Sequence, residues 1–140
     1  MKIKFGKTKK VYQGKIFRIY HQDVVLPSGK KGVFEYCERF PSVSVLAFNE
    51  KGELLMINEY RHGYKKNVWF LPGGRVDKAG DTPKKAAMRE LREEGGFRAK
   101  KMKLLFTKSP SNTLFWDIYI YAAKDLIDRK STRLNSSHRL

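Results

Sequence analysis

The chain of 140 residues has the length of a single domain, and its 41% apolar and 13% aromatic content suffices for a packed core. We expect neither a disordered protein nor a membrane protein, because no stretch approaches the roughly 20 consecutive apolar residues of a membrane span. The net charge of +16 raises the question of a nucleic-acid partner. No aromatic-interleaved RNA-binding signature accompanies the charge, so we expect no such partner.

The first ten residues, MKIKFGKTKK, form a basic N-terminal lead without the apolar segment that a secretory signal requires. Cys37 is the single cysteine and cannot form an internal disulfide, which fits a reducing compartment. Its place in an alternating run favours a packing role. These features together predict a cytoplasmic protein.

Short β-type runs fill the chain from residue 11 to residue 59. Residues 11–42 predict an N-terminal β-meander, with turn chemistry at Pro27 and Gly29. The run SVSVLAF is typical of a buried strand, and Gly52 then lies in a turn before LLMINEY. This order predicts a hairpin over residues 43–59, at the start of a core that we place at residues 43–127.

The clearest helix lies between residues 82 and 96. Thr82 is a good N-cap, Pro83 suits the first helical position, and Gly95–Gly96 ends the segment. The stripe expected to be buried consists of Ala87, Met88 and Leu91. Two further β-like runs, KKMKLLFTK and TLFWDIYIYAA, follow the helix. Strands around one strong central helix indicate a mixed α/β domain, here of the α+β kind.

The composition changes abruptly after Ile127, where the hydrophobic pattern ends. The segment Asp128–His138, DRKSTRLNSSH, is identical to the frame-one translation of a widely used sequencing adapter. We therefore interpret residues 128–140 as a non-native tail and exclude them from reasoning about the fold. On this interpretation the core is incomplete at its C-terminus, and any functional residue beyond Ile127 is absent.

Three carboxylates gather on the predicted helix, although the chain is strongly basic. Glu90, Glu93 and Glu94 are three and four residues apart and therefore project to one side of a helix. Their mutual repulsion destabilises the helix unless a cation lies among them. Hard divalent cations such as Mg²⁺ or Mn²⁺ prefer oxygen ligands of this kind. A solvent-exposed acidic face is the alternative interpretation.

The sequence GGRVDKAGDTPKKAAMRELREEGGF resembles the Nudix box, a pattern of G, five residues, E, seven residues and REUxEExGU, where U is bulky and aliphatic. Arg89 begins the matching second half, and Phe97 takes its last, usually aliphatic place. Asp81 stands where the first Glu is usual, and six residues separate it from Gly74. This extra residue predicts a bulge around Lys78–Ala79.

The resemblance implies roles for the matching positions. Glu90 and Glu94 would be metal ligands, with Glu93 a ligand or a close neighbour of one. Arg89 would hold carboxylates in place through charge-assisted bonds. The glycine loop would contribute Gly74 and the backbone carbonyl of Gly73, which is often a further ligand. Water would be the nucleophile, with Glu90, Glu93 or a glutamate on a later loop as the general base.

Segments outside the box are similar to the ADP-ribose pyrophosphatase branch of the family. They are VYQGKIFRIY, MINEYRHGYKKNVWFLPGG and the Ser-Pro followed by YIYAAKDL. Arg61 would contact phosphate or ribose oxygens of the substrate, with an ordinary surface arginine as the alternative. By analogy with the branch, Phe17 would stack on a nucleobase, with a core phenylalanine as the alternative. Departures include Glu59, where Gln is usual, and Phe70, where Glu is usual.

The resemblance therefore implies a mixed β-sheet sandwiched by helices and Mg²⁺-dependent hydrolysis of a nucleoside diphosphate linked to another group. ADP-ribose or a nucleotide sugar is the favoured substrate, and a homodimer is compatible with the branch. Three alternatives stay open. They are a nucleoside-triphosphate house-cleaning pyrophosphatase, a catalytically inactive module that binds nucleotide or RNA, and inactivity of the 140-residue chain itself.

Overall fold

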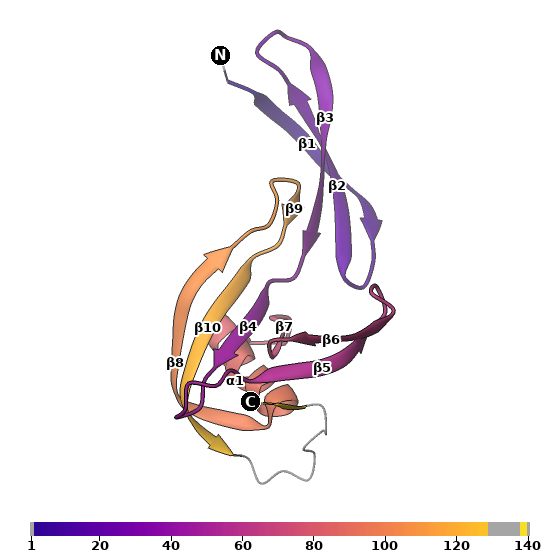
Figure 1. Cartoon of the computed structure of the whole chain (residues 1–140). Helices are drawn as coiled ribbons and strands as arrows, with labels where there is room; N and C mark the ends of the chain where they lie inside the picture. The colour runs from indigo at the N-terminus through magenta and orange to yellow at the C-terminus, as the bar shows by residue number, and fades with distance from the viewer. Residues whose placement is uncertain (1, 129–137, 140) are drawn as a thin grey trace. The chain divides into compact units, whose positions relative to one another are not determined.

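The computed structural model describes residues 2–128 and the backbone of residues 138–139 (Figure 1). The chain divides into two compact units. Residues 1–40 and 109–117 form the first, here called the meander unit, and residues 41–108 and 118–140 form the second, the helix unit. The adapter interpretation falls mostly outside the described residues, although the backbone of His138–Arg139 pairs as β11 with Ile57 and Met56.

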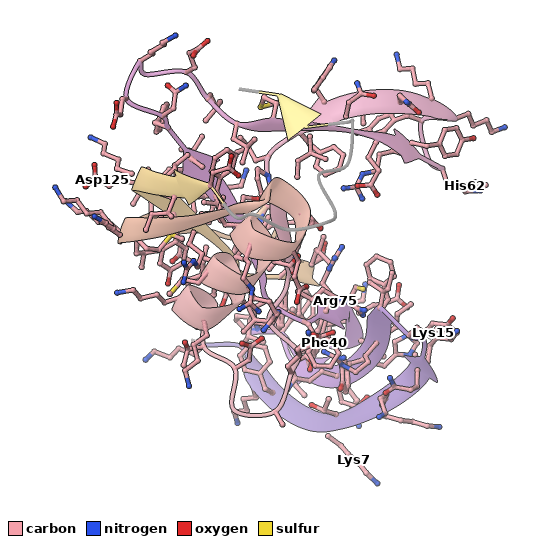
Figure 2. All side chains as sticks on the ribbon, turned by 90° about the horizontal axis from the view of Figure 1, so that it is seen from below. Lys7, Lys15, Phe40, His62, Arg75 and Asp125 are labelled. Atoms are coloured by element: carbon pink, nitrogen blue, oxygen red, sulfur yellow. The ribbon has the colours of Figure 1, made fainter. Side chains whose placement is uncertain are left out.

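The meander unit is a four-stranded sheet in the order β1-β2-β3-β9. Its strands are β1 Lys4–Gln13, β2 Phe17–Val25, β3 Lys31–Arg39 and β9 Leu114–Phe115. The first three are antiparallel neighbours, and β9 runs parallel to β3. The predicted meander is present, but β1 begins inside the basic lead. Every residue of β1 is exposed, and Lys7 projects away from the ribbon (Figure 2).

The helix unit contains a mixed sheet in the order β7-β4-β10-β8. Its strands are β4 Ser42–Ala47, β7 Gly73–Arg75, β8 Phe97–Lys108 and β10 Ile118–Asp128. Strand β10 is parallel to β4 and antiparallel to β8, and β7 is antiparallel to β4. Helix α1, Pro83–Gly95, packs on this sheet, so the predicted mixed α/β class is confirmed.

The hairpin predicted over residues 43–59 forms only next to its turn. An antiparallel bridge from Phe48 to Leu54 and the bond from the Leu55 N–H to the Ala47 carbonyl close the turn at Gly52. Strand β5, Met56–Arg61, then pairs with β6, Lys66–Phe70, while β4 lies between β7 and β10. The reason is burial: four of the six β4 residues are buried, and a central position protects both of the strand's edges.

The caps of α1 are those predicted from the sequence. Thr82 is extended, and its hydroxyl accepts a hydrogen bond from the Lys85 amide at 3.2 Å. Pro83 follows at the first helical position. Gly96 has a φ of 75°, and its N–H donates to the Arg92 carbonyl, which ends the helix in the left-handed conformation that glycine tolerates.

The core lies between α1 and the sheet. It consists of Val43, Val45, Ala47, Leu55, Ala86, Ala87, Leu91, Tyr121 and Ala123. Met88, expected in the buried stripe, is 48% exposed, and Ala86 is buried in its place. The helix is therefore rotated, so that the side bearing residues 86, 87 and 91 faces the sheet. Among the described residues, no helix is long and apolar enough to cross a membrane.

We expect Leu91→Ala to lower the free energy of unfolding by about 2–5 kcal/mol, because the Leu91 side chain is fully buried and its loss leaves a cavity. Met88→Ala on the same helix is the matched control and should change stability by no more than about 0.5 kcal/mol. Urea unfolding followed by circular dichroism measures both. Equal losses for the two variants would contradict this orientation of the helix.

Candidate metal and catalytic site

The glycine pair lets strand β7 approach α1 very closely. Gly74 pairs with Val43 in the sheet, and a Cβ atom added to Gly74 would lie 2.5 Å from the carboxyl carbon of Glu90. A Cβ on Gly73 would collide with the carbonyl oxygen of Val43. A side chain at Gly73 would therefore push β7 away from β4, and a side chain at Gly74 would displace the Glu90 carboxyl group. The glycines bring the loop backbone directly against the carboxylates of the helix.

Glu90 and Glu94, four residues apart, lie under this loop. The Gly73 N–H donates a hydrogen bond to Glu94 Oε2 at 3.2 Å. The Glu90 side chain is only 15% exposed, and its carboxyl lies near enough to that of Glu94 for each to affect the pKa of the other. The loop and the helix thus hold two carboxyl groups close together, away from most of the solvent.

Burial and mutual repulsion disfavour ionisation of this pair. The pKa of Glu94 is raised to about 7: burial is the largest cause, the Gly73 N–H opposes it, and the nearby charges of Glu90 and Glu59 add to it. Burial also raises the pKa of Glu90, partly offset by the charge of Arg89. Two adjacent negative charges are therefore disfavoured on this pair.

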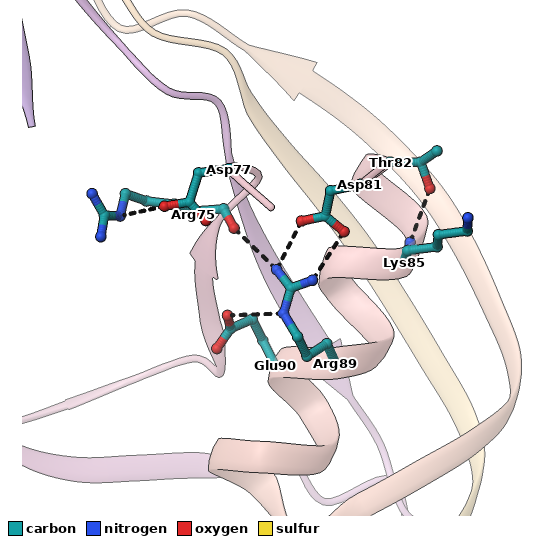
Figure 3. Close-up of polar contacts among 7 residues, drawn as sticks. All are labelled: Arg75, Asp77, Asp81, Thr82, Lys85, Arg89 and Glu90. Atoms are coloured by element: carbon teal, nitrogen blue, oxygen red, sulfur yellow. Dashed lines mark hydrogen bonds and ion pairs between the residues drawn. The ribbon is translucent and has the colours of Figure 1, made fainter. Parts of the chain in front are cut away.

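Arg89 anchors the loop that precedes the helix (Figure 3). Its guanidinium donates two hydrogen bonds to the Asp81 carboxylate, each of 2.9 Å, and one of 3.3 Å to the Arg75 carbonyl. The Asp81 and Arg89 side chains are 5% and 13% exposed. The Arg89 bond holds the pKa of Asp81 below its ordinary value. Arg89 therefore makes the contacts that a carboxylate-holding role requires.

The extra loop residue is accommodated where the sequence predicts a bulge. The Asp81 N–H donates to the Lys78 carbonyl at 3.0 Å, and Gly80 has a φ of 70°. This turn directs the Asp81 carboxylate toward Arg89, away from the pair formed by Glu90 and Glu94. In this position Asp81 neutralises the arginine and supports the loop.

Glu93 does not join the pair. Its side chain is exposed, although its charge still affects the pKa values of Glu90 and Arg89. Across the described part of the chain, no three His, Cys, Asp or Glu side chains converge as a ready-made metal cage. Two half-buried carboxylates nevertheless fit a hard cation such as Mg²⁺, which often takes one or two carboxylates and completes its shell with water and substrate phosphates.

Arg61 and Phe17 lie in different units. Arg61 ends β5, and its guanidinium carbon lies 3.8 Å from the centre of the Phe70 ring. Phe17 begins β2 with 41% of its surface exposed, and its ring centre lies 5.5 Å from the Arg39 guanidinium. The same guanidinium lies 4.0 Å from the ring centre of Trp116. Both predicted contact residues are therefore held by cation–π contacts.

Glu59, Arg39 and Trp116 were not identified as site residues from the sequence. Glu59 acts electrostatically on Glu94, and it shares one face of β5 with Arg61, two positions later. The two-residue spacing of Glu59 and Arg61 in a β-type run already indicated that they share a face. Arg39 and Trp116 meet only because β3 and the segment after β9 come together in the meander unit.

Comparisons with known proteins identify a family and similar proteins. The NUDIX domain family matches residues 38–134. An ADP-ribose pyrophosphatase of Bacillus subtilis (strain 168) is 32% identical over 122 residues, which are 84% of this chain and 64% of that protein. An ADP-ribose pyrophosphatase of Mycobacterium tuberculosis is 37% identical over 95 residues, 68% of this chain and 46% of that protein. This chain thus spans less than two thirds of either relative.

A solved structure described as an ADP compounds hydrolase superposes with a TM-score of 0.79 and covers 97% of this chain and 74% of its own. Sequence identity in that comparison is 23%, so it supports the fold alone. The mixed sheet with helix α1 is accordingly a known arrangement of strands and helix.

The ion pair between Arg89 and Asp81 predicts a pH signature. Because the folded pKa of Asp81 is lowered, its contribution to stability is present above about pH 4 and is lost as the pH falls through the folded pKa. Asp81→Asn should therefore have a lower melting temperature than wild type at pH 7, and the difference should shrink toward pH 3. Thermal unfolding across this range measures it.

Arg89→Gln and the double variant complete a mutant cycle. We expect the loss in the double variant to be smaller than the sum of the single losses, because each single change leaves the other partner without its bidentate bond. Additive losses, or a difference between wild type and Asp81→Asn that does not depend on pH, would contradict the anchoring role.

Proposed function

The chain belongs to the NUDIX domain family, and from this premise we propose that it hydrolyses the diphosphate bond of a nucleoside diphosphate linked to another group, with the help of a divalent cation. ADP-ribose or a nucleotide sugar is the proposed substrate class. The ADP-ribose pyrophosphatases among its relatives support this class. A cytoplasmic location and a homodimer stay predictions.

One observation carries the proposal: Glu90 and Glu94 are packed together under the glycine loop, and the long contact from Arg89 to Glu90 is the one ion pair that they make among the described residues. The nearest guanidinium nitrogen, Arg89 Nε, is 3.9 Å from Glu90 and belongs to a side chain already bonded to Asp81. Glu90 and Glu94 would bind Mg²⁺ or Mn²⁺, with the Gly73 carbonyl and Glu93 as further proposed ligands. Such a cation supplies Lewis-acid stabilisation of the charge on phosphate oxygens.

The chain's own residues prepare this site in three ways. The Gly73 N–H orients Glu94, so that one of its oxygens is fixed toward the loop. Arg89 is a positioning residue, since it ties Asp81 and the Arg75 carbonyl to the helix. Glu90 or Glu93 is proposed to accept the proton of the attacking water. A glutamate on a later loop stays the alternative for this role.

Arg61 of the helix unit and Phe17 of the meander unit are each proposed, separately, to contact the substrate. The face of the Arg61 guanidinium rests on Phe70, which leaves its N–H groups in the plane for phosphate or ribose oxygens. Phe70 stands where the related branch usually has Glu, so an aromatic ring here holds the arginine. Phe17 retains an exposed ring on which a base can stack.

Glu94→Gln is the first test. It keeps the size of the side chain but removes the charge that would hold the cation, so we expect weaker Mg²⁺ binding and hydrolysis slower by at least about 10²-fold, as the loss of several kcal/mol of charge stabilisation implies. Isothermal calorimetry with Mg²⁺ and release of AMP from ADP-ribose are the measurements.

Glu50→Gln, an exposed carboxylate on the turn before β5, is the matched control and should leave both quantities unchanged. Parallel assays with nucleoside triphosphates under the same Mg²⁺ concentration separate the two substrate classes. Faster turnover of nucleoside triphosphates than of ADP-ribose would contradict the proposed substrate class. Undiminished Mg²⁺ binding by Glu94→Gln would refute the assignment of the ligands.

The raised pKa of Glu94 predicts a pH dependence of metal binding. Because a cation and a proton compete for the same carboxyl, Mg²⁺ affinity should rise by about tenfold between pH 6 and pH 8 and level off above the Glu94 pKa of about 7. Calorimetry at fixed ionic strength measures this change. A dissociation constant that stays constant over this range would show that Glu94 is not a ligand.

A further inference from the structure

A hollow of about 430 Å³ lies beside α1 in the helix unit. Lys85, Met88 and Arg92 of the helix line it, together with Arg98 and Ala99 of β8 and Ile127 of β10. Arg89 also borders the hollow, but its guanidinium is already bonded to Asp81. The hollow is formed entirely by residues of one compact unit.

This hollow lies on a different side of α1 from the proposed metal ligands. Lys85, Met88 and Arg92 follow one another at spacings of three and four residues and share a helix face. Each residue of an α-helix is rotated by about 100° from the previous one. Arg92 and Glu94, two residues apart, therefore point about 200° apart around the axis. The two sites use opposite faces of the same helix.

Three of the four cations around the hollow have no ion-pair partner among the described residues. Lys85, Arg92 and Arg98 make no ion pair with any carboxylate in the described part of the chain, whereas other basic residues, such as Lys101 with Asp125, do. Three like charges around one cavity repel one another, and the repulsion is relieved when an anion enters. Two of them are arginines, whose planar forks suit the oxygens of a phosphate group.

The rest of the lining is apolar. Met88 is 48% exposed and Ile127 is 37% exposed, although both are large hydrophobic residues. Ala99 completes this surface between them. An inorganic ion would leave the apolar surface in contact with water, while a ligand with an apolar body would cover it. The hollow therefore combines the recognition elements for an anionic head and an apolar body.

We propose that this hollow binds a small, soluble organic phosphate monoester with an aromatic or aliphatic body. Its dianionic head contacts Lys85, Arg92 and Arg98, and its body rests on Met88 and Ile127. The ligand chemistry is independent of the divalent cation proposed for Glu90 and Glu94. Binding at the hollow and hydrolysis at the carboxylates are consequently separable in experiment.

1-Naphthyl phosphate is a suitable probe, since it carries a dianionic head on a flat apolar body. In wild-type protein with ¹³C-labelled methionine methyl groups, saturating probe should shift the Met88 resonance through the ring current, while Met56 and Met102 stay in place. 1-Naphthol and inorganic phosphate, each with half of the chemistry, should bind more weakly. Absence of binding, or binding that leaves Met88 unshifted, overturns the proposal.

Substitution of the arginines tests the contribution of charge. Arg92→Gln with Arg98→Gln should weaken probe binding by about tenfold for each arginine, as the loss of one charge-assisted bond implies. Lys100→Gln with Lys103→Gln removes the same charge from exposed positions of β8 outside the hollow and should leave the affinity unchanged. Equal weakening in the two double variants would mean general attraction to a basic protein and would overturn the site.

Two further arms identify the source of the phosphate and the independence of the site. The affinity for the probe should be the same in wild type and in Glu94→Gln, and the same with and without Mg²⁺. An affinity that changes with the Glu94 substitution or with Mg²⁺ would place the probe at the carboxylate site. Phosphatidylcholine vesicles with and without phosphatidic acid present the same head group on a membrane. Binding to the acidic vesicles without binding to naphthyl phosphate would exclude a soluble ligand.

Discussion

The close approach of the Gly73–Gly74 backbone to helix α1 is the contact on which the candidate site depends. Without side chains on these residues, the loop reaches Glu90 and donates its Gly73 N–H to Glu94. The same contact removes both carboxyl groups from much of their solvent, and burial then raises their pKa values. A site that strongly disfavours two adjacent negative charges in the free protein gains most from a divalent cation, which is the physical basis of the proposed metal binding.

A protein with 30 basic residues could be expected to neutralise two glutamates internally. The structure prevents this through the anchor that Arg89 forms with Asp81. The bidentate bond turns the guanidinium toward the loop and the Arg75 carbonyl, so that only its Nε faces Glu90, at 3.9 Å. Asp81 thus keeps the one nearby arginine from satisfying the carboxylate pair. Because Asp81 holds the Arg89 guanidinium, Glu90 and Glu94 are left without a close, bidentate bond to an arginine.

Helix α1 separates two groups of charges of opposite sign that are at most weakly paired within the described chain. The face toward the glycine loop bears carboxylates, and the opposite face bears Lys85 and Arg92, which meet Arg98 at the hollow. Charges on the surface of a small protein are ordinarily solvated and of little consequence. Here each group lies in a concave or partly buried setting, where charge complementarity with a ligand has more effect. The helix therefore organises both the proposed hydrolytic site and the proposed phosphate site.

Sequence alone determined the features that depend on neighbouring residues: the Thr82 and Gly96 caps of α1, the shared side of Glu90 and Glu94, and the turn before Asp81. Each follows from local chemistry or from a helical period of 3.6 residues. Only the tertiary structure decided that β4 lies between β7 and β10, that Met88 is exposed and that Glu93 stands apart from the other two glutamates. It also brought Arg98 and Ile127 to the helix from distant strands. Strand pairing and helix rotation are set by which surfaces bury the most apolar area together, and a local pattern does not contain that information.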